Sequence, residues 1–480
     1  MSPAFVRNAR RSAAHLALAA TLAAAGGPSW AQDAPQPPAD MRSAGREILK
    51  QLVGLRSVHS TGTTPTAHWI ADRLAAGGFA SDDIHFLAPE AYPAMGNVVV
   101  RLRGNGKNKP ILYIGHLDVV EAKREDWNFD PFVLTEKDGW LYGRGTIDML
   151  GQDSAMLASL LRLKKEGFVP DRDIIIAFTA DEEAGAVANG ADFLLAKHRA
   201  LVDASLAINP DAGEAALKNG RKLYLSVQSS EKVYLTFGLE VTDKGGHSSR
   251  PTAGNPIYRL AKGLDRLSGF EFPVHMTATT KLYFAGRAGL ESGQTKADML
   301  AVAGARPYPA AIKRLAREVE TNIMLRTTCT VTGVDGGHAE NALPQRARAT
   351  IQCRLVPGET QESVRRRLAK VLADPSIAIS VINAAVPSPE SAPTPAILKT
   401  LGGVMHEMWP GVAVIPNMSA GASDNIYTRA AGIPTYGIDG MFDDLDDSRA
   451  HGRDERIGVK VYDEELEFTY RLMKALSQMK

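Results

Sequence analysis

The segment ILYIGHLDVV, residues 111–120, indicates the fold most directly, because an apolar run of strand length ends directly in the polar residues His116 and Asp118. Similar runs, typical of strands buried on both faces, cover residues 97–102, 111–115, 174–179 and 204–208. Residues 151–166 are predicted to form a helix that ends at Gly167. This alternation predicts an α/β fold with a mostly parallel sheet flanked by helices.

Five segments carry side chains of the types that commonly bind metal ions. They are His116 and Asp118 in ILYIGHLDVV, Asp148 in GRGTIDMLG, Glu182 and Glu183 in AFTADEEAG, Asp211 in LAINPDAGE, and His451 in SRAHGRDER. Three of these segments follow strand-like runs, and functional groups gather at the carboxyl ends of strands in such sheets. Two imidazoles and several carboxylates suit a pair of zinc-like ions better than one ion. The set predicts hydrolysis of an amide bond.

The N-terminus has the pattern of an export signal. Arg7, Arg10 and Arg11 precede an Ala/Leu-rich stretch over 12–25, and Ser29-Trp30-Ala31 fits a signal-peptidase site. We therefore predict a signal peptide over 1–31 cleaved near Ala31, a tether over 32–40, and a periplasmic location. The apolar stretch is too short for a comfortable membrane span.

Length and charge narrow the class of protein. About 450 mature residues predict two domains. The formal charge of +1 falls to about −2 without the three signal arginines, so neither nucleic acid nor a membrane is an expected partner. The cysteines are Cys329 and Cys353, too few for a cysteine-zinc site. Whether they form a disulfide stays open, because strand register is not visible in the sequence.

The pattern of predicted strands and helices divides the chain into three segments. Residues 41–225 and 358–480 have the α/β pattern and are predicted to form one catalytic domain. Residues 226–357 are predicted to form an inserted α+β domain. Its predicted strands are 233–241, 322–332 and 346–355, and its helix is 255–267. Helices are also predicted over 361–373 and 464–479.

The ordered motifs resemble those of the M20 metallopeptidases, the group of aminoacylase, carboxypeptidase G and succinyl-diaminopimelate desuccinylase. HLD, GRGTIDMLG and DEEAG match the first half of the pattern. GGHSSRP (245–251), NALP (341–344), CRLVPGE (353–359), GASDN and RAHGRDER complete it. The resemblance covers nearly all of the predicted mature chain. It implies that the inserted domain is a lid, through which some members form homodimers.

The resemblance also implies a role for each motif residue. His116 and Asp211 would hold one zinc ion, Glu183 and His451 the other, and Asp148 would bridge them, with cobalt or manganese as substitutes. Asp118 would orient a ligand histidine, and Glu182 would be the general base. Here Asn209-Pro210-Asp211 stands where relatives carry Glu-Pro or Asn-Glu, so Glu214 is kept as an alternative to Asp211.

Four further positions would face the substrate. His247 would stabilise the tetrahedral oxyanion, often from the partner subunit in dimeric members. Arg354, Asn341 and Gly421 would bind substrate, and a guanidinium suits a free α-carboxylate. The acidic run Asp443, Asp444, Asp446 and Asp447 is interpreted as a solvated loop, with a preference for basic substrates as the alternative.

Three functions remain open from the sequence. The first is a zinc exopeptidase, either a carboxypeptidase or a dipeptidase, acting on small peptides with a free carboxylate. The second is hydrolysis of N-acyl amino acids by the same residues. The third is a non-catalytic binding protein, which would be expected to lack a ligand or the base; this chain retains Glu182 and all five ligand positions. Sequence does not separate the first two, because loops build the acyl pocket.

Overall fold

The structure, a computed structural model, describes residues 34–184 and 187–479. The predicted signal peptide lies outside them. Residues Pro35–Lys480 form one compact unit. Helix α1 (Ala39–Gly54) begins two residues inside the predicted tether. Within the described ranges, no helix has both the length and the apolar character that a membrane span requires.

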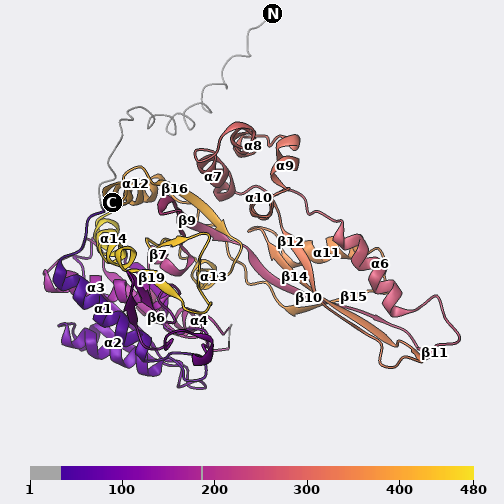
Figure 1. Cartoon of the computed structure of the whole chain (residues 1–480), viewed down its shortest axis with the longest axis horizontal. Helices are drawn as coiled ribbons and strands as arrows, with labels where there is room; N and C mark the ends of the chain where they lie inside the picture. Colours follow the sequence, from indigo (N-terminus) through magenta and orange to yellow (C-terminus); the bar gives the residue numbers. More distant parts are fainter. Residues whose placement is uncertain (1–33, 185–186, 480) are drawn as a thin grey trace, which may run out of the picture. The chain divides into compact units, whose positions relative to one another are not determined.

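The described residues include a ten-stranded sheet (Figure 1). Its strands are β1 (Ile84–Leu87), β2 (Asn97–Leu102), β3 (Ile111–His116), β6 (Ile174–Thr179), β7 (Leu206–Asn209), β8 (Ala215–Lys218), β9 (Arg221–Glu231), β16 (Ala413–Ser419), β17 (Thr435–Gly437) and β18 (Phe442–Asp444). The central strands β6, β3, β7 and β17 are parallel, which confirms the predicted fold class. Strand β2 instead runs antiparallel to β6.

Helices cover both faces of this sheet. α3 (Leu150–Lys165) packs against β3, α1 and α14 (Val459–Ser477), and α12 (Pro395–Met408) packs on α14. α4 (Gly190–Lys197) and α5 (Arg199–Val202) share an apolar cluster with Leu112 and Ile175 on the other face. The predicted end of α3 is observed, because Gly167 has φ +67° and Phe168 N–H donates to the Leu163 carbonyl. α2 (Thr64–Ala76) packs on β1 and β2, and α13 (Asn425–Ala430) packs on α4 and β17.

A second, four-stranded antiparallel sheet has the order β12–β14–β10–β15. Its strands are β10 (Val233–Thr242), β12 (Thr328–Gly336), β14 (Arg346–Leu355) and β15 (Ala378–Asn383). α6 (Pro256–Ser268) and α11 (Gln361–Leu372) bury Leu260 and Leu368 in the core of this sheet. The sheet therefore continues past the predicted boundary at 357, because it includes β15. Helix α11, which packs on the sheet, also lies beyond this boundary.

A helical group precedes β12. It consists of α7 (Ala278–Arg287), α8 (Gly293–Ala303), α9 (Pro309–Leu315) and α10 (Val319–Leu325). The predicted strand over 322–332 is wrong in its first part, since residues 322–325 form the last turn of α10. Met324 and Leu325 enter the apolar core of this group, together with Phe284. A short apolar run does not distinguish a strand from a buried helical turn.

The structure pairs the two cysteines. Cys329 on β12 lies opposite Cys353 on β14, and their sulfur atoms are 2.01 Å apart. We expect the Cys329→Ser, Cys353→Ser double variant to lose about 3 kcal/mol of unfolding free energy, since the bridge closes a loop in the unfolded chain. Urea denaturation measures this loss, and reduced wild-type protein should match the variant. An unchanged urea midpoint after reduction would contradict the prediction.

Candidate metal centre

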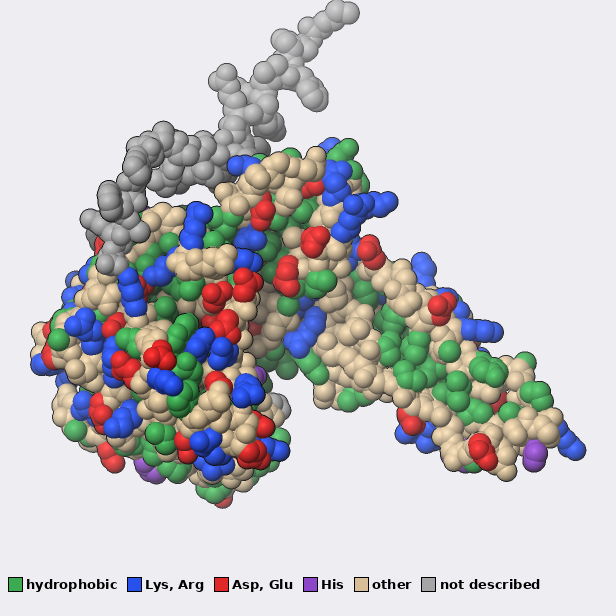
Figure 2. Space-filling model, viewed as in Figure 1, with side chains coloured by type: hydrophobic (Ala, Val, Ile, Leu, Met, Phe, Trp, Pro, Cys, Tyr) green, Lys and Arg blue, Asp and Glu red, His purple; other side chains and the backbone are tan. Residues whose placement is uncertain are grey.

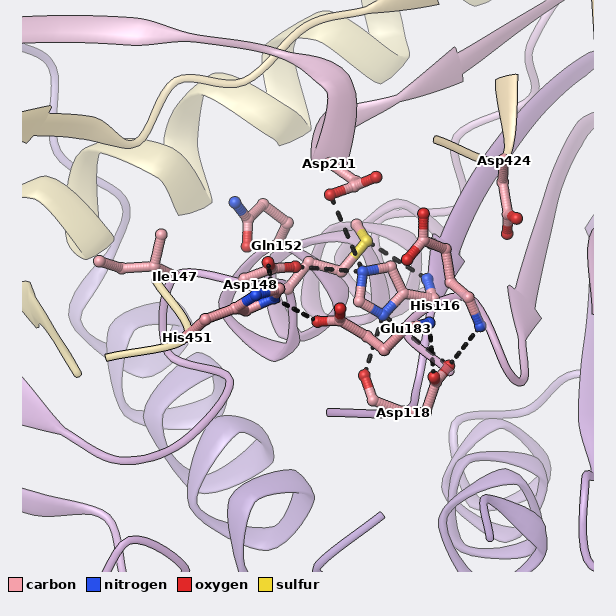
Figure 3. A network of polar contacts seen from close by, with 12 residues as sticks. His116, Asp118, Ile147, Asp148, Gln152, Glu183, Asp211, Asp424 and His451 are labelled. Atoms are coloured by element: carbon pink, nitrogen blue, oxygen red, sulfur yellow. Dashed lines mark hydrogen bonds and ion pairs between the residues drawn. The ribbon is translucent and has the colours of Figure 1, made fainter. Parts of the chain in front are cut away.

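The predicted ligands meet at the carboxyl edge of the central strands (Figure 3). His116 is the last residue of β3, and Glu183 lies in the turn after β6. Asp211 lies in the short 3-10 helix Pro210–Ala212, directly after β7. Asp148 precedes α3, and His451 lies between β18 and β19 (Arg456–Gly458), which pairs with β5 (Trp140–Tyr142). The convergence of His116, Glu183 and Asp211 follows from parallel strands that end at one edge.

The five side chains form two groups with Asp148 in common. His116, Asp148 and Asp211 form one, and Asp148, Glu183 and His451 form the other; within each group the candidate ligand atoms lie within 4.8 Å of one another. His116 Nε2 lies 3.1 Å from Asp148 Oδ1, and His451 Nε2 lies 2.9 Å from Asp148 Oδ2. The two carboxylate oxygens of Asp148 therefore face different groups. Imidazole and carboxylate donors in this arrangement fit a bridged pair of zinc ions.

Within the protein itself, positive charge on the two histidines balances negative charge on the carboxylates of these groups. Burial opposes a charged His116, but hydrogen bonds to Asp148 and Asp211 raise its pKa well above the usual value. Hydrogen bonds to Asp148 and Glu183 raise the pKa of His451 to about 10. The positive charges of the protonated imidazoles stand in for those of metal ions. We therefore expect metal binding to release protons from both histidines.

Asp118 holds the centre together without belonging to either group. Its backbone carbonyl lies 2.9 Å from His116 Nδ1, which favours a proton on Nδ1 and leaves Nε2 free to ligate. Its buried carboxylate accepts the backbone N–H groups of Glu182 and Glu183, at 3.1 and 3.0 Å. Asp118 thus contacts the ligand histidine, as its predicted role requires, and also fixes the turn that carries the predicted base.

Glu182 lies beside this centre in a setting that disfavours its charge. Burial, reinforced by the nearby carboxylates of Asp211, Asp424 and Glu183, raises its pKa to about 9. Two bound cations would oppose this effect, because a metal ion is the largest local charge in such a site. The role of Glu182 as the general base stays a prediction.

Asp211, rather than its alternative Glu214, completes the first group. Asp211 Oδ1 lies 3.8 Å from His116 Nε2. Glu214 Oε1 instead accepts a hydrogen bond of 2.9 Å from the Tyr224 hydroxyl and belongs to neither group. The Pro-Asp order after β7 therefore still delivers a carboxylate to the centre.

A buried polar network that was not predicted from the sequence lies behind the ligands. Asp424 accepts hydrogen bonds from Thr179 Oγ1 at 3.2 Å and Asn189 Nδ2 at 2.6 Å, and Figure 3 shows it beside the site. Burial raises its pKa to about 7. Next to it, Ser423 donates to Glu231, which pairs with Arg429. The motif GASDN marked this loop, but it did not indicate these partners.

Arg354 has a free donor close to a second cation. It lies on β14, and its buried Nη1 has no hydrogen-bond partner within the described part of the chain. Burial, followed by the charge of Arg354, lowers the pKa of Lys232 to about 7. Lys232 Nζ donates to the Arg326 carbonyl at 2.8 Å. This pair of basic groups suits a carboxylate, and Lys232 was not predicted.

The other predicted substrate residues are exposed. His247 on β11 (Gly246–His247) and Asn341, next to β13 (Ala342–Leu343), are exposed at a small two-stranded sheet. His247 Nδ1 accepts the backbone N–H of Ser249. Gly421 is exposed in the loop after β16. Among the described contacts, none joins these three residues to a ligand, so their predicted roles stay predictions.

Known proteins share this fold and order of motifs. The model of Peptidase family M20/M25/M40 matches residues 112–475. The chain belongs to this family. It is accordingly a metal-dependent hydrolase that acts on amide bonds.

Individual relatives of this M20 chain carry different names. The probable carboxypeptidase S-like 2 of Dictyostelium discoideum is 30% identical, and the match covers 76% of this chain and 71% of the relative. The N-fatty-acyl-amino acid synthase/hydrolase PM20D1 of Bos taurus is 28% identical over 76% of this chain and 74% of that protein. An M20 family metallo-carboxypeptidase from Sulfolobus solfataricus shares the fold with a TM-score of 0.65, at 21% identity, over 90% of this chain and 99% of that one.

Proposed function

We propose that this chain is an exported di-zinc exopeptidase that cleaves small peptides with a free C-terminal carboxylate, as a carboxypeptidase or dipeptidase. The observation that carries the proposal is the sharing of Asp148 between two ligand groups, with Glu182 beside them. Arg354, whose buried Nη1 has no hydrogen-bond partner within the described residues, would bind the substrate carboxylate. The N-terminal arginines and the Ser29-Trp30-Ala31 site support export.

The proposed mechanism assigns proton transfer to Glu182. Bound metal ions supply Lewis-acid polarisation of the amide carbonyl and acidify a water molecule. Glu182 accepts a proton from the attacking water and returns it to the leaving amine nitrogen. Asp118 keeps Glu182 and His116 in place through the hydrogen bonds to its carboxylate and carbonyl. His247, supplied by a partner subunit, would stabilise the oxyanion.

N-acyl amino acid hydrolysis is the second candidate. The 28% identical relative named as an N-fatty-acyl-amino acid synthase/hydrolase favours it. The test is a panel of dipeptides, longer peptides and N-acyl amino acids offered to the zinc-loaded protein. Cleavage of dipeptides without cleavage of N-acyl amino acids would eliminate the second candidate, and the reverse result would eliminate the first.

A homodimer through the second sheet is also proposed. Figure 2 shows apolar side chains on the surface of this region. Ile257 and Tyr258 on α6 and Val334 on β12 are exposed there. Sedimentation of the full chain tests the proposal, and a monomer at micromolar concentration would contradict it.

We expect two zinc ions per chain, one for each ligand group. Asp211→Ala should retain about one ion, whereas Asp148→Ala should lose both, since both groups contain Asp148. Elemental analysis after dialysis measures the zinc content, and Asp126→Ala, a variant of an exposed residue, is the control.

Prolonged chelation should abolish activity, and added zinc or cobalt should restore it. Full activity after chelation would contradict the metal assignment.

A further inference from the structure

A cavity of about 280 Å³ adjoins the metal centre, because Asp148 and Asp211 form part of its wall. Its other acidic wall residues are Glu214, Asp439, Asp443 and Asp444, and none of the wall residues in the described part of the chain is a lysine, arginine or histidine. Bound metal ions would neutralise Asp148 and Asp211, and the Tyr224 hydroxyl already satisfies one oxygen of Glu214. Burial raises the pKa of Asp439 to about 7, so the half-buried Asp443 and Asp444 give the cavity its negative character.

A buried acceptor without a partner lies in the same wall. Gln152 is 3% exposed, and its Nε2 donates to Asp439 Oδ2 at 3.3 Å. Its Oε1 has no hydrogen-bond partner within the described residues. Figure 3 shows Gln152 beside Asp148. A buried carbonyl oxygen without a donor is costly, so this atom indicates a ligand that brings an N–H group.

The spacing of the acidic groups favours an organic cation over a third metal ion. The two ligand groups found among the described residues, each with atoms within 4.8 Å, include none of Asp439, Asp443 and Asp444. Apolar side chains line the same wall, namely Ile147, Met441 and Leu445. An aliphatic stem with a charged end matches such a mixed lining, as in the side chains of lysine and arginine.

We propose that this cavity is a specificity pocket for a substrate residue with a long aliphatic chain that ends in a cation. The inference rests on the proposed peptidase function and deepens it by naming the substrate class. Buried Asp439 and Gln152 form the inner end of the pocket, and half-buried Asp443 and Asp444 form its outer part. The acidic run is thus divided: Asp443 and Asp444 line the pocket, whereas exposed Asp446 contacts Lys218.

The test compares matched substrates that differ in one charge. Zinc-loaded protein is offered lysyl-alanine with norleucyl-alanine, and alanyl-lysine with alanyl-norleucine. In one of the two pairs we expect kcat/KM to be at least about tenfold higher for the lysine peptide, while the other pair differs little. The Asp443→Asn, Asp444→Asn double variant should bring that ratio close to one. The Asp446→Asn control, in the same loop but outside the cavity, should keep it.

Binding measurements separate failure of this inference from failure of the proposed function. If no peptide is cleaved, the exopeptidase proposal fails, and calorimetry with the zinc-loaded Glu182→Gln variant and the same four peptides tests the pocket. Tighter binding of one lysine peptide than its norleucine match, lost in the double variant, supports the pocket. Ratios within about twofold in both pairs, or a preference that survives in the double variant, would overturn it.

Discussion

Glu182→Gln should lower kcat by about 10²–10⁴-fold, the range expected when a general acid–base group is removed. The amide keeps the shape of the side chain but does not accept the proton from water. Asp118 binds the backbone N–H of residue 182 rather than its side chain, so the turn should stay in place. Glu182 belongs to neither ligand group, so the zinc content should not change. Steady-state kinetics and elemental analysis on one preparation measure both quantities.

The control for this prediction is Glu125→Gln, an exposed carboxylate in the short helix Arg124–Asp126. It should retain wild-type kcat. If Glu182→Gln keeps kcat within about tenfold of wild type at full zinc content, another group transfers the proton. If zinc is lost together with activity, Glu182 is a ligand and the two ligand groups need revision.

The convergence of three candidate ligands, His116, Glu183 and Asp211, was predictable because it depends on local pattern. Apolar runs of strand length mark β3, β6 and β7, and parallel strands bring their carboxyl ends to one edge. His116 and Glu183 therefore meet although 67 residues separate them in the chain. Asp148 and His451 are not at strand ends, and resemblance to known motifs placed them.

Other features depend on contacts that no local pattern reveals. Arg429 on α13 and Glu231 at the end of β9 form an ion pair although they are 198 residues apart in the chain. The acidic cavity joins Glu214 to Asp443 through the pairing of β8 with β18. The pairing of β15 with β10 is likewise not visible in residues 378–383.

Arg429→Met should lower the free energy of unfolding by about 3–5 kcal/mol, the usual cost of removing one partner from a buried ion pair. Arg429 and Glu231 are fully buried, with Nη1 and Oε1 3.1 Å apart. Arg429 also donates to the Thr435 carbonyl, and Glu231 accepts from the N–H and hydroxyl of Ser423. Loss of the guanidinium leaves a buried carboxylate without its countercharge. Urea denaturation measures the effect.

The pH dependence distinguishes a lost charge pair from lost packing. Burial raises the pKa of Glu231 to about 6 even though Arg429 opposes the shift. A carboxyl whose pKa is higher in the folded state favours folding below its unfolded value of about 4.3 and loses that contribution as pH rises through the folded value. Without Arg429 the pKa should rise further, so Arg429→Met should be destabilised less at pH 5 than at pH 8.

Two further variants make this prediction decisive. Arg365→Met removes an exposed ion pair with Glu362 and should cost less than about 1 kcal/mol. Glu231→Gln added to Arg429→Met removes the unpaired carboxylate and should restore part of the lost stability, because a neutral amide is cheaper to bury than a charge. If Arg429→Met unfolds at the same urea concentration as Arg365→Met, the buried pair does not hold the Ser423–Asp424 loop beside the metal centre.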